Sequence, residues 1–487
     1  MATDTLQHPG EFHLTGPNII GSSGEQIDIS DLVLELNIYQ DMDKPFMSGN
    51  ILMNDAKGLY EYLPLIGQER LIFKLTTPSA SSSVSFEEYH AVIYNVEKRF
   101  NTNDRSQAYL LNWTTLDNYR NFRTKVSKSY KGNISQIIVQ LLTEELKSSK
   151  PMYIDLTKNP RKYVVPNLSP YAACSFLREE AISAEHQSPH FVFFENSIGY
   201  HFRSIDSLLG SQGSLSVAHK KTYKSQPPDD PKDLGDSLGT ILAFQVEDST
   251  NTFSNGRGGM FASTLLYHDM FNKTLQKFEY DYIRDCYKKR NQLNQDSGKY
   301  GPFISESEVD GDKIITDFPE SKLFLHPTSG KELYNEGVST NSATPYTNNN
   351  AEDWLQESLS REMEREYFTL KIETYGDTSI MVGDIVDIMI PSNRGVLSTS
   401  GGKEAMDAIL SGRYLVTQLH HQVSPQEQQH KMTFNVMKDS VSSALPTTTM
   451  KYSGEPVGKV DVGLSTDKKK LTPKPRKVLP MKAGVWT

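Results

Sequence analysis

One order of three segments occurs twice in this chain of 487 residues, and it constrains the fold more than any other feature. The first copy has an apolar strand that ends in proline (Leu71 to Pro78), then "HAVIYNVEKRF", then "QAYLLNWTT". The second copy has Ile385 to Pro391, then "GRYLVTQLHHQV", then "HKMTFNVMKD". In both copies a short polar connection joins the last two segments, which is typical of an antiparallel hairpin. The order predicts a duplicated antiparallel unit, although any two small antiparallel barrels share a likeness of this kind.

Alternation of apolar and polar residues with a period of two predicts further strands. Near the start, "IDISDLVLELNIYQ" alternates leucine and isoleucine with polar residues between Leu32 and Ile38. The most regular stretch is "HFVFFENSIGYHFRSIDSLL" (residues 190–209), with two alternating aromatic runs around a turn that contains Gly199. We expect this stretch to be a β-hairpin packed against a core.

Other stretches change to the helical period. "NISQIIVQLLTEEL" predicts one helix, and "SPYAACSFLREEAISAE" predicts a second with Ser169 as N-cap and Pro170 at the first helical position. The apolar stripe expected on the second helix is Ala173, Phe176, Leu177 and Ala181. A third helix is expected in "NNAEDWLQESLSREMEREY", with the stripe Trp354, Leu355, Leu359 and Met363. The predicted class is α+β, mainly antiparallel β, with two similar small tube-type β-barrels and an inserted or adjacent α+β domain.

The charge of the chain is unevenly distributed. The formal net charge of -9 argues against a general nucleic-acid binder. From Val441 to the end there are nine Lys or Arg and three Asp or Glu, so this tail carries +6 and the rest carries -9 - 6 = -15. A basic tail on an acidic body indicates that the tail contacts a partner, unless it is only a solvated extension. The residues expected to bind that partner are Lys468, Lys469, Lys470, Lys474, Arg476 and Lys477.

Cysteine content and hydropathy indicate the compartment. Cys174 and Cys286 are too few for a disulfide framework, and neither has a Cys or His neighbour at ligand spacing, so we expect both to be structural. No run approaches the roughly 18 apolar residues of a membrane helix, so no membrane insertion is expected. A chain assembled in reducing cytoplasm fits these features.

No motif of catalysis is found. There is no Gly-x-x-x-x-Gly-Lys-Ser/Thr phosphate loop and no Gly-x-Ser-x-Gly nucleophile elbow. "GRGGMF", which begins at Gly256, lacks the third glycine of a dinucleotide loop and predicts a tight turn. His420 and His421 are adjacent on a predicted strand, so they point to opposite faces and cannot easily share a metal. Paired carboxylates such as Glu179 and Glu180 are expected on the solvent faces of helices. We therefore expect no catalytic residues, no cofactor and no metal site.

Four segments taken in order carry a family resemblance. They are "DISDLVLELNIYQDMDKPFMSGNILMNDAKGL"; "VPNLSPYAACSFLREEAISAEHQSPHFVFFENSIGYHFRSIDSLL"; "GGMFASTLLYHDMFNKTLQKFEYDY"; and "GDTSIMVGDIVDIMIPS" with "SGRYLVTQLHH" and "KMTFNVMKDS". Their order resembles the central baseplate hub proteins of contractile-tailed bacteriophages, which are related to the hub part of type VI secretion spike proteins. The resemblance extends from about Gly16 to Ser440.

The resemblance implies a structural, non-enzymatic protein of the virion. It implies a homotrimeric ring of pseudo-sixfold symmetry that joins the hexameric tail tube to a trimeric central spike with an OB-fold domain. Other baseplate proteins would bind outside, and DNA would pass through the bore without specific binding. The acidic body suggests a bore that repels DNA.

Carried over to this chain, the resemblance divides it into five parts. They are tube domain one (1–113), a helix–hairpin domain (114–206), a split tube domain two (207–247 and 352–440), an insertion (248–351) and an extended basic tail (441–487). The polar region from Tyr282 to Asn350 and the basic tail both go beyond a minimal hub. Alternative interpretations are the hub part of a secretion-system spike, a tail-associated lysozyme or cell-wall-binding module, and a carbohydrate-binding module.

Overall fold

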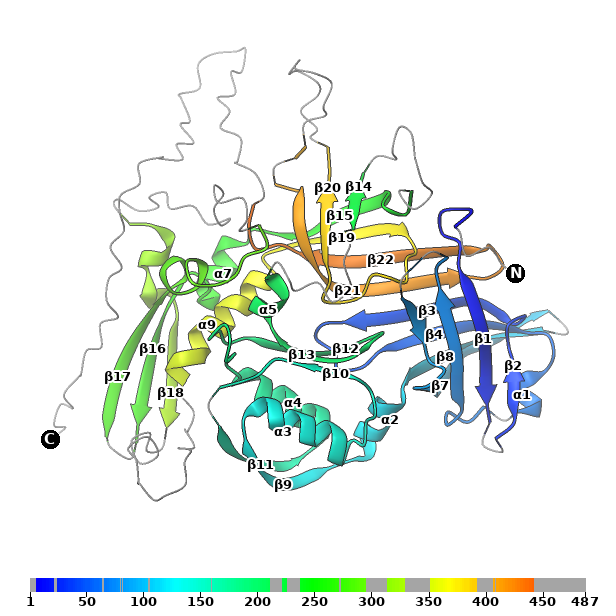
Figure 1. The fold of residues 1–487 in the computed structure, drawn as a ribbon, viewed down its shortest axis with the longest axis horizontal. Helices are drawn as coiled ribbons and strands as arrows, with labels where there is room; N and C mark the ends of the chain where they lie inside the picture. The colour runs from blue at the N-terminus through cyan, green and yellow to red at the C-terminus, as the bar shows by residue number, and fades with distance from the viewer. Residues whose placement is uncertain are drawn as a thin grey trace, which may run out of the picture.

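A computed structural model gives the structure of the chain. It describes residues 6–441 except 22–23, 64, 79, 81, 104–105, 159, 211–220, 226–236, 271–272, 295–312, 329–350, 392–405 and 408. The fold is mainly antiparallel β with helices beside the sheets, so the predicted α+β class is confirmed (Figure 1).

The largest element is a sheet of 14 strands. Its order along the main path is β15 (Ile241–Ser249), β19 (Phe368–Tyr375), β22 (Gln429–Met437), β21 (Gly412–Ser424), β3 (Val33–Asp41), β4 (Ser48–Asp55), β8 (Ser106–Thr115), β7 (Ala91–Asn103), β5 (Arg70–Thr76), β1 (His13–Ile20) and β2 (Gln26–Asp28). Three short strands branch from this path: β6 (Ser83–Ser85), β14 (Thr222–Lys224) and β20 (Ile385–Met389). No sheet of the described residues closes on itself, so the expected count of two barrels is not confirmed. The two halves form one sheet because β21 pairs with β3.

Alternating side chains give the large sheet two different faces. On its core face, Leu36 and Ile38 of β3 belong to one buried cluster, and Leu370 and Ile372 of β19 belong to a second. The other face, which we call the polar face, carries residues such as Asn37 between these apolar positions. The buried clusters therefore lie on one side of a continuous sheet.

A helical domain follows the first half of the sheet. The aromatic stretch forms the predicted hairpin, β12 (Phe191–Asn196) and β13 (Gly199–Ser204), and β10 (Met152–Ile154) adds a parallel strand. A separate two-stranded ribbon contains β9 (Val126–Gly132) and β11 (Arg161–Leu168). The helical segments are α2 (Leu116–Arg123), α3 (Ile134–Gln140), the π-helix η1 (Leu141–Glu145), α4 (Pro170–Glu179) and α5 (Ile205–Leu209).

The second helix, α4, begins as predicted but differs in one residue of its stripe. Ser169 is its N-cap and Pro170 its first residue. Ala173 and Leu177 are buried, whereas Phe176 is 46% exposed and stacks on Tyr163 of β11. The stripe is narrower than expected because this aromatic ring covers the neighbouring ribbon instead of the core.

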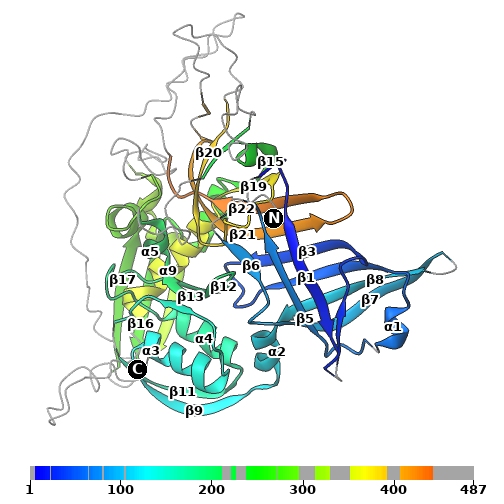
Figure 2. The ribbon, with the colours of Figure 1, turned by 45° about the vertical axis from the view of Figure 1, so that its right-hand side comes forward.

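A third region lies at the end of the molecule far from β1 and β2 (Figures 1 and 2). Its sheet contains β17 (Thr274–Asp281), β16 (Ala262–Asp269) and β18 (Leu323–Thr328), and α9 (Ala351–Arg365) packs against it. The remaining helical segments are α1 (Leu59–Tyr62), α7 (Thr252–Gly258), the π-helix η2 (Tyr282–Tyr287) and the 3-10 helices η4 (Ile315–Asp317) and η5 (Pro319–Ser321).

The "GRGGMF" segment is the end of a helix and not an isolated turn. Gly259, at φ 94°, stops α7, and the amides of Gly259 and Met260 both donate to the carbonyl of Asn255. This left-handed glycine after a helix is a common stop signal. Among the described helices, none combines the length and the apolar character needed to cross a bilayer.

Candidate assembly interface

The duplicated segments have the same pattern of strand pairing. In the first half, the antiparallel neighbours run β5, β7, β8, β4, β3, and in the second half they run β20, β21, β22, β19, β15. We call the first set repeat one and the second set repeat two. The segments compared in the sequence are the first three strands of each repeat.

Irregularities in the ladders match as well. A single extra residue interrupts the β7–β8 ladder at Tyr94 and the equivalent β21–β22 ladder at Thr417. Another interrupts β3–β4 at Leu34 and β15–β19 at Leu242. A β-bulge is a local feature that unrelated sheets have no reason to share at the same places. The two repeats therefore match in topology and at these two bulges, whereas the further irregularities of β7–β8 and β15–β19 have no counterpart.

Within the chain, one joint connects the repeats. The first part of β21 pairs with β20, and residues 418–423 of the same edge pair with β3, from Gln418 opposite Asp41 to Val423 opposite Leu36. Under this joint Leu36 is 1% exposed and Ile38 is 0% exposed. His420 stacks on Tyr39 with ring centroids 4.5 Å apart. The joint thus covers β3 from Leu36 to Asp41.

The strand of repeat one that is equivalent to β21 has the same edge without a partner strand. Only Ala91 and Val92 of β7 pair with β5. Beyond them, β7 pairs with β8 on one side, and no other described strand pairs with its second side. Tyr94 is 52% exposed and Phe100 is 55% exposed. This part of β7 corresponds to the part of β21 that holds β3.

The strand of repeat two that is equivalent to β3 is also uncovered. Among the described strands, β15 pairs only with β19, so its outer edge is open. The ladder registers make Phe244 equivalent to Leu36 and Val246 equivalent to Ile38. Phe244 is 41% exposed and Val246 is 39% exposed. Open, apolar strand edges are sites at which another chain can pair. One chain therefore presents both halves of its own internal joint, separated by the rest of the sheet.

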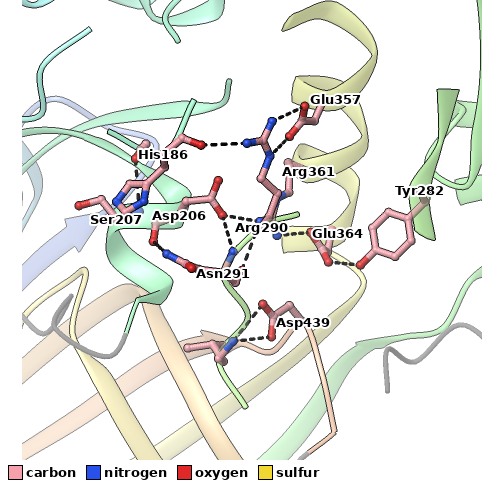
Figure 3. A network of polar contacts seen from close by, with 12 residues as sticks. His186, Asp206, Ser207, Tyr282, Arg290, Asn291, Glu357, Arg361, Glu364 and Asp439 are labelled. Carbon is pink, nitrogen blue, oxygen red and sulfur yellow. Dashed lines mark hydrogen bonds and ion pairs between the residues drawn. The ribbon is translucent and has the colours of Figure 1, made fainter. Parts of the chain in front are cut away.

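A buried ionic network fixes the helical domain, α9 and repeat two to one another (Figure 3). Arg361 of α9 bonds to Asp206 of α5 at 2.6 Å and to Glu364 at 2.7 Å, and all three side chains are at most 4% exposed. Tyr282 donates to Glu364 from η2. Buried charges are tolerated only when they are paired in this way, so the network defines how these elements meet.

The same network extends to the last strand. The amide of Asn291 donates to Asp206 at 3.2 Å, and the amide of Leu293 donates to Asp439 at 3.2 Å, just after β22. Burial raises the pKa of Asp439 to about 7. Nearby, Arg290 forms an ion pair with Glu357 of α9. Five separate parts of the chain are tied by these contacts.

The polar side of α9 is not evident from its sequence pattern. That pattern predicts an apolar stripe, of which Trp354 is buried and Leu355 and Met363 are half-buried. Arg361 and Glu364 are buried more deeply than either of those two. Charged residues three apart usually indicate a solvated helix face, so only the structure could reveal their burial.

A second buried ion cluster lies beside a cavity of about 140 Å³ between repeat one and the helical domain. Lys150 contacts Glu195 and lies 3.9 Å from Asp117, which also accepts a bond of 3.1 Å from the hydroxyl of Tyr200. Burial raises the pKa of Glu195. The charged groups satisfy one another, so the arrangement resembles a structural tie between domains more than an active site.

Other reactive side chains are buried or bonded to groups of the same chain. No cluster of three or more metal-ligating residues occurs in the part of the chain that is described. Cys174 and Cys286 are buried, which raises the pKa of both thiols, in agreement with their predicted structural role. His421 bonds to His430 at 3.1 Å on the core face, whereas His420 bonds to Asn37 at 2.7 Å on the polar face. The two adjacent histidines thus point to opposite faces, as predicted.

The partner-binding residues predicted in the tail lie outside the described residues. They are Lys468, Lys469, Lys470, Lys474, Arg476 and Lys477. Their role stays a prediction.

Comparison with known proteins gives similarity in structure only. No protein-family model and no curated protein matches the sequence. The tail protein from Neisseria meningitidis has a TM-score of 0.50 and 10% identity, with 88% of this chain and 97% of that chain covered. The 43 kDa tail protein of prophage MuSo2 from Shewanella oneidensis has a TM-score of 0.46 and 8% identity, with 88% and 98% covered. The fold assignment rests on the first comparison: this chain has the fold of a tail protein.

Proposed function

We propose that this chain is the structural hub of a phage tail baseplate, in which three copies form a ring. The observation that carries the proposal is the pair of open edges on β7 and β15, which together reproduce the internal β21–β3 joint. If β15 of one copy pairs with β7 of the next, every joint between repeats is of the same kind. Such a head-to-tail contact closes into a ring when the rotation per joint fits.

The count of three copies is what the resemblance to baseplate hub proteins implies, and the two repeats are compatible with it. Each copy contributes one internal joint and one joint to its neighbour, so three copies give six equivalent joints. A ring of this kind has threefold symmetry in sequence and nearly sixfold symmetry in shape. It suits a position between a hexameric tail tube and a trimeric spike with an OB-fold domain, with further baseplate proteins outside and a bore for DNA.

The proposed role is assembly instead of catalysis, in a virion assembled in the host cytoplasm. It is supported by the tail-protein fold and by reactive groups that are used internally. The domain division stays part of the proposal, with tube domains at 1–113 and at 207–247 with 352–440. The basic tail would bind the spike or a neighbouring baseplate protein.

The first test is the mass of the purified chain in solution. We expect light scattering after size exclusion to give three times 54.9 kDa, alone or after addition of the spike. A mass of one chain under both conditions would contradict the ring.

A second test changes the open edge. Phe244→Lys with Val246→Lys places charge where β7 of the next copy would cover the side chains, and each lost contact removes about 1–2 kcal/mol of apolar burial. We expect this variant to elute as a monomer at concentrations that keep the unaltered chain trimeric. The matched control is Phe122→Lys on α2, where the ring is 80% exposed but no joint is proposed. Equal behaviour of both variants would exclude this edge as the contact.

The hub part of a secretion-system spike is the second candidate, because the proposed ring would serve both machines. The two are distinguished by the partner: pull-down with a tail tube protein supports the phage hub, and pull-down only with a secretion tube protein supports the alternative.

A further inference from the structure

Two buried imidazoles meet near the tip of the β21–β22 hairpin. His421 and His430 are both 0% exposed, and Nδ1 of His421 lies 3.1 Å from Nε2 of His430. Their outer nitrogens, Nε2 of His421 and Nδ1 of His430, have no hydrogen-bond partner among the described residues. An added proton would therefore charge the pair and leave a further buried N–H without an acceptor, which is costly.

His430 also holds two other parts of the chain. Its amide donates to the carbonyl of Gly10 at 2.9 Å, and its carbonyl accepts from the amide of Gly376 at 2.8 Å. The ring of Phe12 lies edge-on to the imidazole, with centroids 6.3 Å apart. A Cβ atom on Gly376 would lie 2.0 Å from the ring of His430. The N-terminal segment (residues 6–12) and the loop after β19 (residues 376–384) thus pack directly on this side chain.

The pair lies beside two connections between the repeats. His421 stands opposite Ile38 of β3 in the β21–β3 joint. Thr378 of the loop 376–384 exchanges two hydrogen bonds with Thr77, both of 3.1 Å, and two with Ser82, of 2.8 and 2.9 Å. Thr77 and Ser82 lie between β5 and β6, so the loop that packs on His430 is bonded to repeat one.

In the described part of the chain, no carboxylate bonds to either imidazole. Glu11 accepts from the amide of Gln7 at 2.6 Å, and Asp377 forms an ion pair with Lys221. On β3 the residue that faces the pair is the apolar Ile38. The charged or titratable residues beside the pair on the elements packed around it are His8, Glu11, Tyr375, Asp377, His420 and Lys431. His420 and Lys431 point to the polar face because they alternate with the buried positions.

We propose that the His421–His430 pair is an acid-sensitive latch within the chain. While both imidazoles are neutral, the latch holds the N-terminal segment and the loop 376–384 in place, and protonation releases both. Release breaks the bonds to Gly10 and Gly376 and loosens the contacts of Thr378 with repeat one. The latch belongs to a single chain, so it does not depend on the proposed ring.

The direction of the pH effect follows from the burial of the pair. Burial lowers the pKa of His421 to about 3, with a further contribution from His420, and burial lowers the pKa of His430 well below its usual value. A released histidine titrates near pH 6.5. The released form therefore binds more protons, so the stability of the latch is fully present above about pH 6.5 and is lost as the pH falls.

The latch has to be followed locally, because Asp439 acts in the opposite direction. Asp439 lies beyond the other end of β22, and its raised pKa favours the folded chain in acid. Overall unfolding would combine the two effects. The amides of Gly376 and His430 report on the latch alone, because each is bonded across it.

The test is hydrogen exchange at pH 7 and pH 5, corrected for the intrinsic effect of pH on exchange. Each released imidazole should favour opening about 25-fold more at pH 5 than at pH 7, so we expect roughly 600-fold for the pair at Gly376 and His430. The control is the amide of Thr115 in repeat one, which donates to Met47 at 3.1 Å and should change by less than about threefold. A change at Gly376 and His430 no larger than that at Thr115 would overturn the latch.

A variant assigns the effect to the pair. Glutamine keeps a donor and an acceptor but does not titrate, so His421→Gln should reduce the response of these amides to roughly 25-fold. His13→Gln is the matched control, because His13 is exposed on β1, and it should keep the full response. Equal responses of His421→Gln and the unaltered chain would refute the assignment. If His421→Gln fails to fold, the comparison with Thr115 in the unaltered chain still decides.

Discussion

Repeat one and repeat two share a pairing scheme but differ in what covers them. Leu36 and Ile38 of β3 are fully buried because β21 of the same chain lies beside them. Phe244 and Val246 occupy the same positions of β15 and remain about 40% exposed. Local sequence is apolar in both places, so the difference arises from the neighbour and not from the strand. The burial of a strand edge therefore depends on the strand that pairs with it as much as on its own sequence.

The repeats also fill the same interior space in different ways. In repeat one, Gly49 stands opposite Trp113, whereas in repeat two Leu370 stands opposite Val436. A Cβ atom on Gly49 would overlap the carbonyl oxygen of Asn37 and the ring of Trp113. The total volume is divided as small plus large in one repeat and as two medium side chains in the other.

The largest effect is expected from enlarging the small member of the first pair. Gly49→Ala should lower the free energy of unfolding by more than about 4 kcal/mol, because a backbone oxygen cannot move aside as a side chain can. Leu370→Ala at the equivalent site should cost about 2–4 kcal/mol for the opposite reason, a cavity. Urea unfolding measures both. Equal, small losses would show that the two interiors are not packed as described.

A smaller effect separates the two strand edges. Leu36→Ala should destabilise the isolated chain by about 3 kcal/mol, because it removes buried methyl groups. Phe244→Ala should change the unfolding of the monomer by less than about 1 kcal/mol, because the ring is half exposed. The comparison is made by thermal and urea unfolding at concentrations below assembly. A large loss for Phe244→Ala would mean that β15 is already covered within one chain.

The smallest effect concerns the ends of the equivalent strands β8 and β22. Strand β22 is followed by the buried Asp439, whose pKa is raised to about 7, whereas β8 leads into Leu116 at the start of α2. An unfolded aspartate titrates near pH 4, so between about pH 4 and 7 the folded chain binds more protons and loses stability as pH rises. Asp439→Asn should reduce the loss of stability between pH 5 and pH 8 by on the order of 2 kcal/mol.

The measurement is unfolding at pH 5 and pH 8 for both chains. The control is Asp31→Asn, because Asp31 is exposed and forms only a surface ion pair with Lys57. If the unaltered chain and Asp439→Asn show the same pH dependence, the carboxyl of Asp439 is ionised in the folded state.

Much of the fold could be predicted from local patterns. The hairpin Phe191–Ser204 follows from its alternation and glycine turn, and α4 follows from Ser169 and Pro170. These signals are short in range, so each is complete within about twenty residues. The pairing of β7 with β8 and of β21 with β22 also follows from local patterns, because a short polar connection joins the strands of each pair.

The rest depends on contacts between distant segments. Nothing local marks that β21 continues past β20 and joins β3, which is why separate barrels were expected instead of one sheet. The buried pair of Arg361 and Asp206 could not be predicted for the same reason, because 155 residues separate its members. The row of asparagines across β3, β4, β8 and β7 was also missed: single asparagines on separate strands carry no pattern until the registers are known.

The β21–β3 joint also has a consequence for synthesis of the protein. Translation produces β3 well before β21, with the helical domain and the sheet of β16, β17 and β18 between them. At 5–20 residues per second, the apolar edge of β3 waits roughly 20 to 80 seconds for its covering strand. During that interval every nascent chain on one messenger exposes the same edge close to its neighbours. Protection of this edge by ribosome-associated chaperones, or slow initiation that keeps nascent chains apart, would then determine how much folded protein the cell obtains.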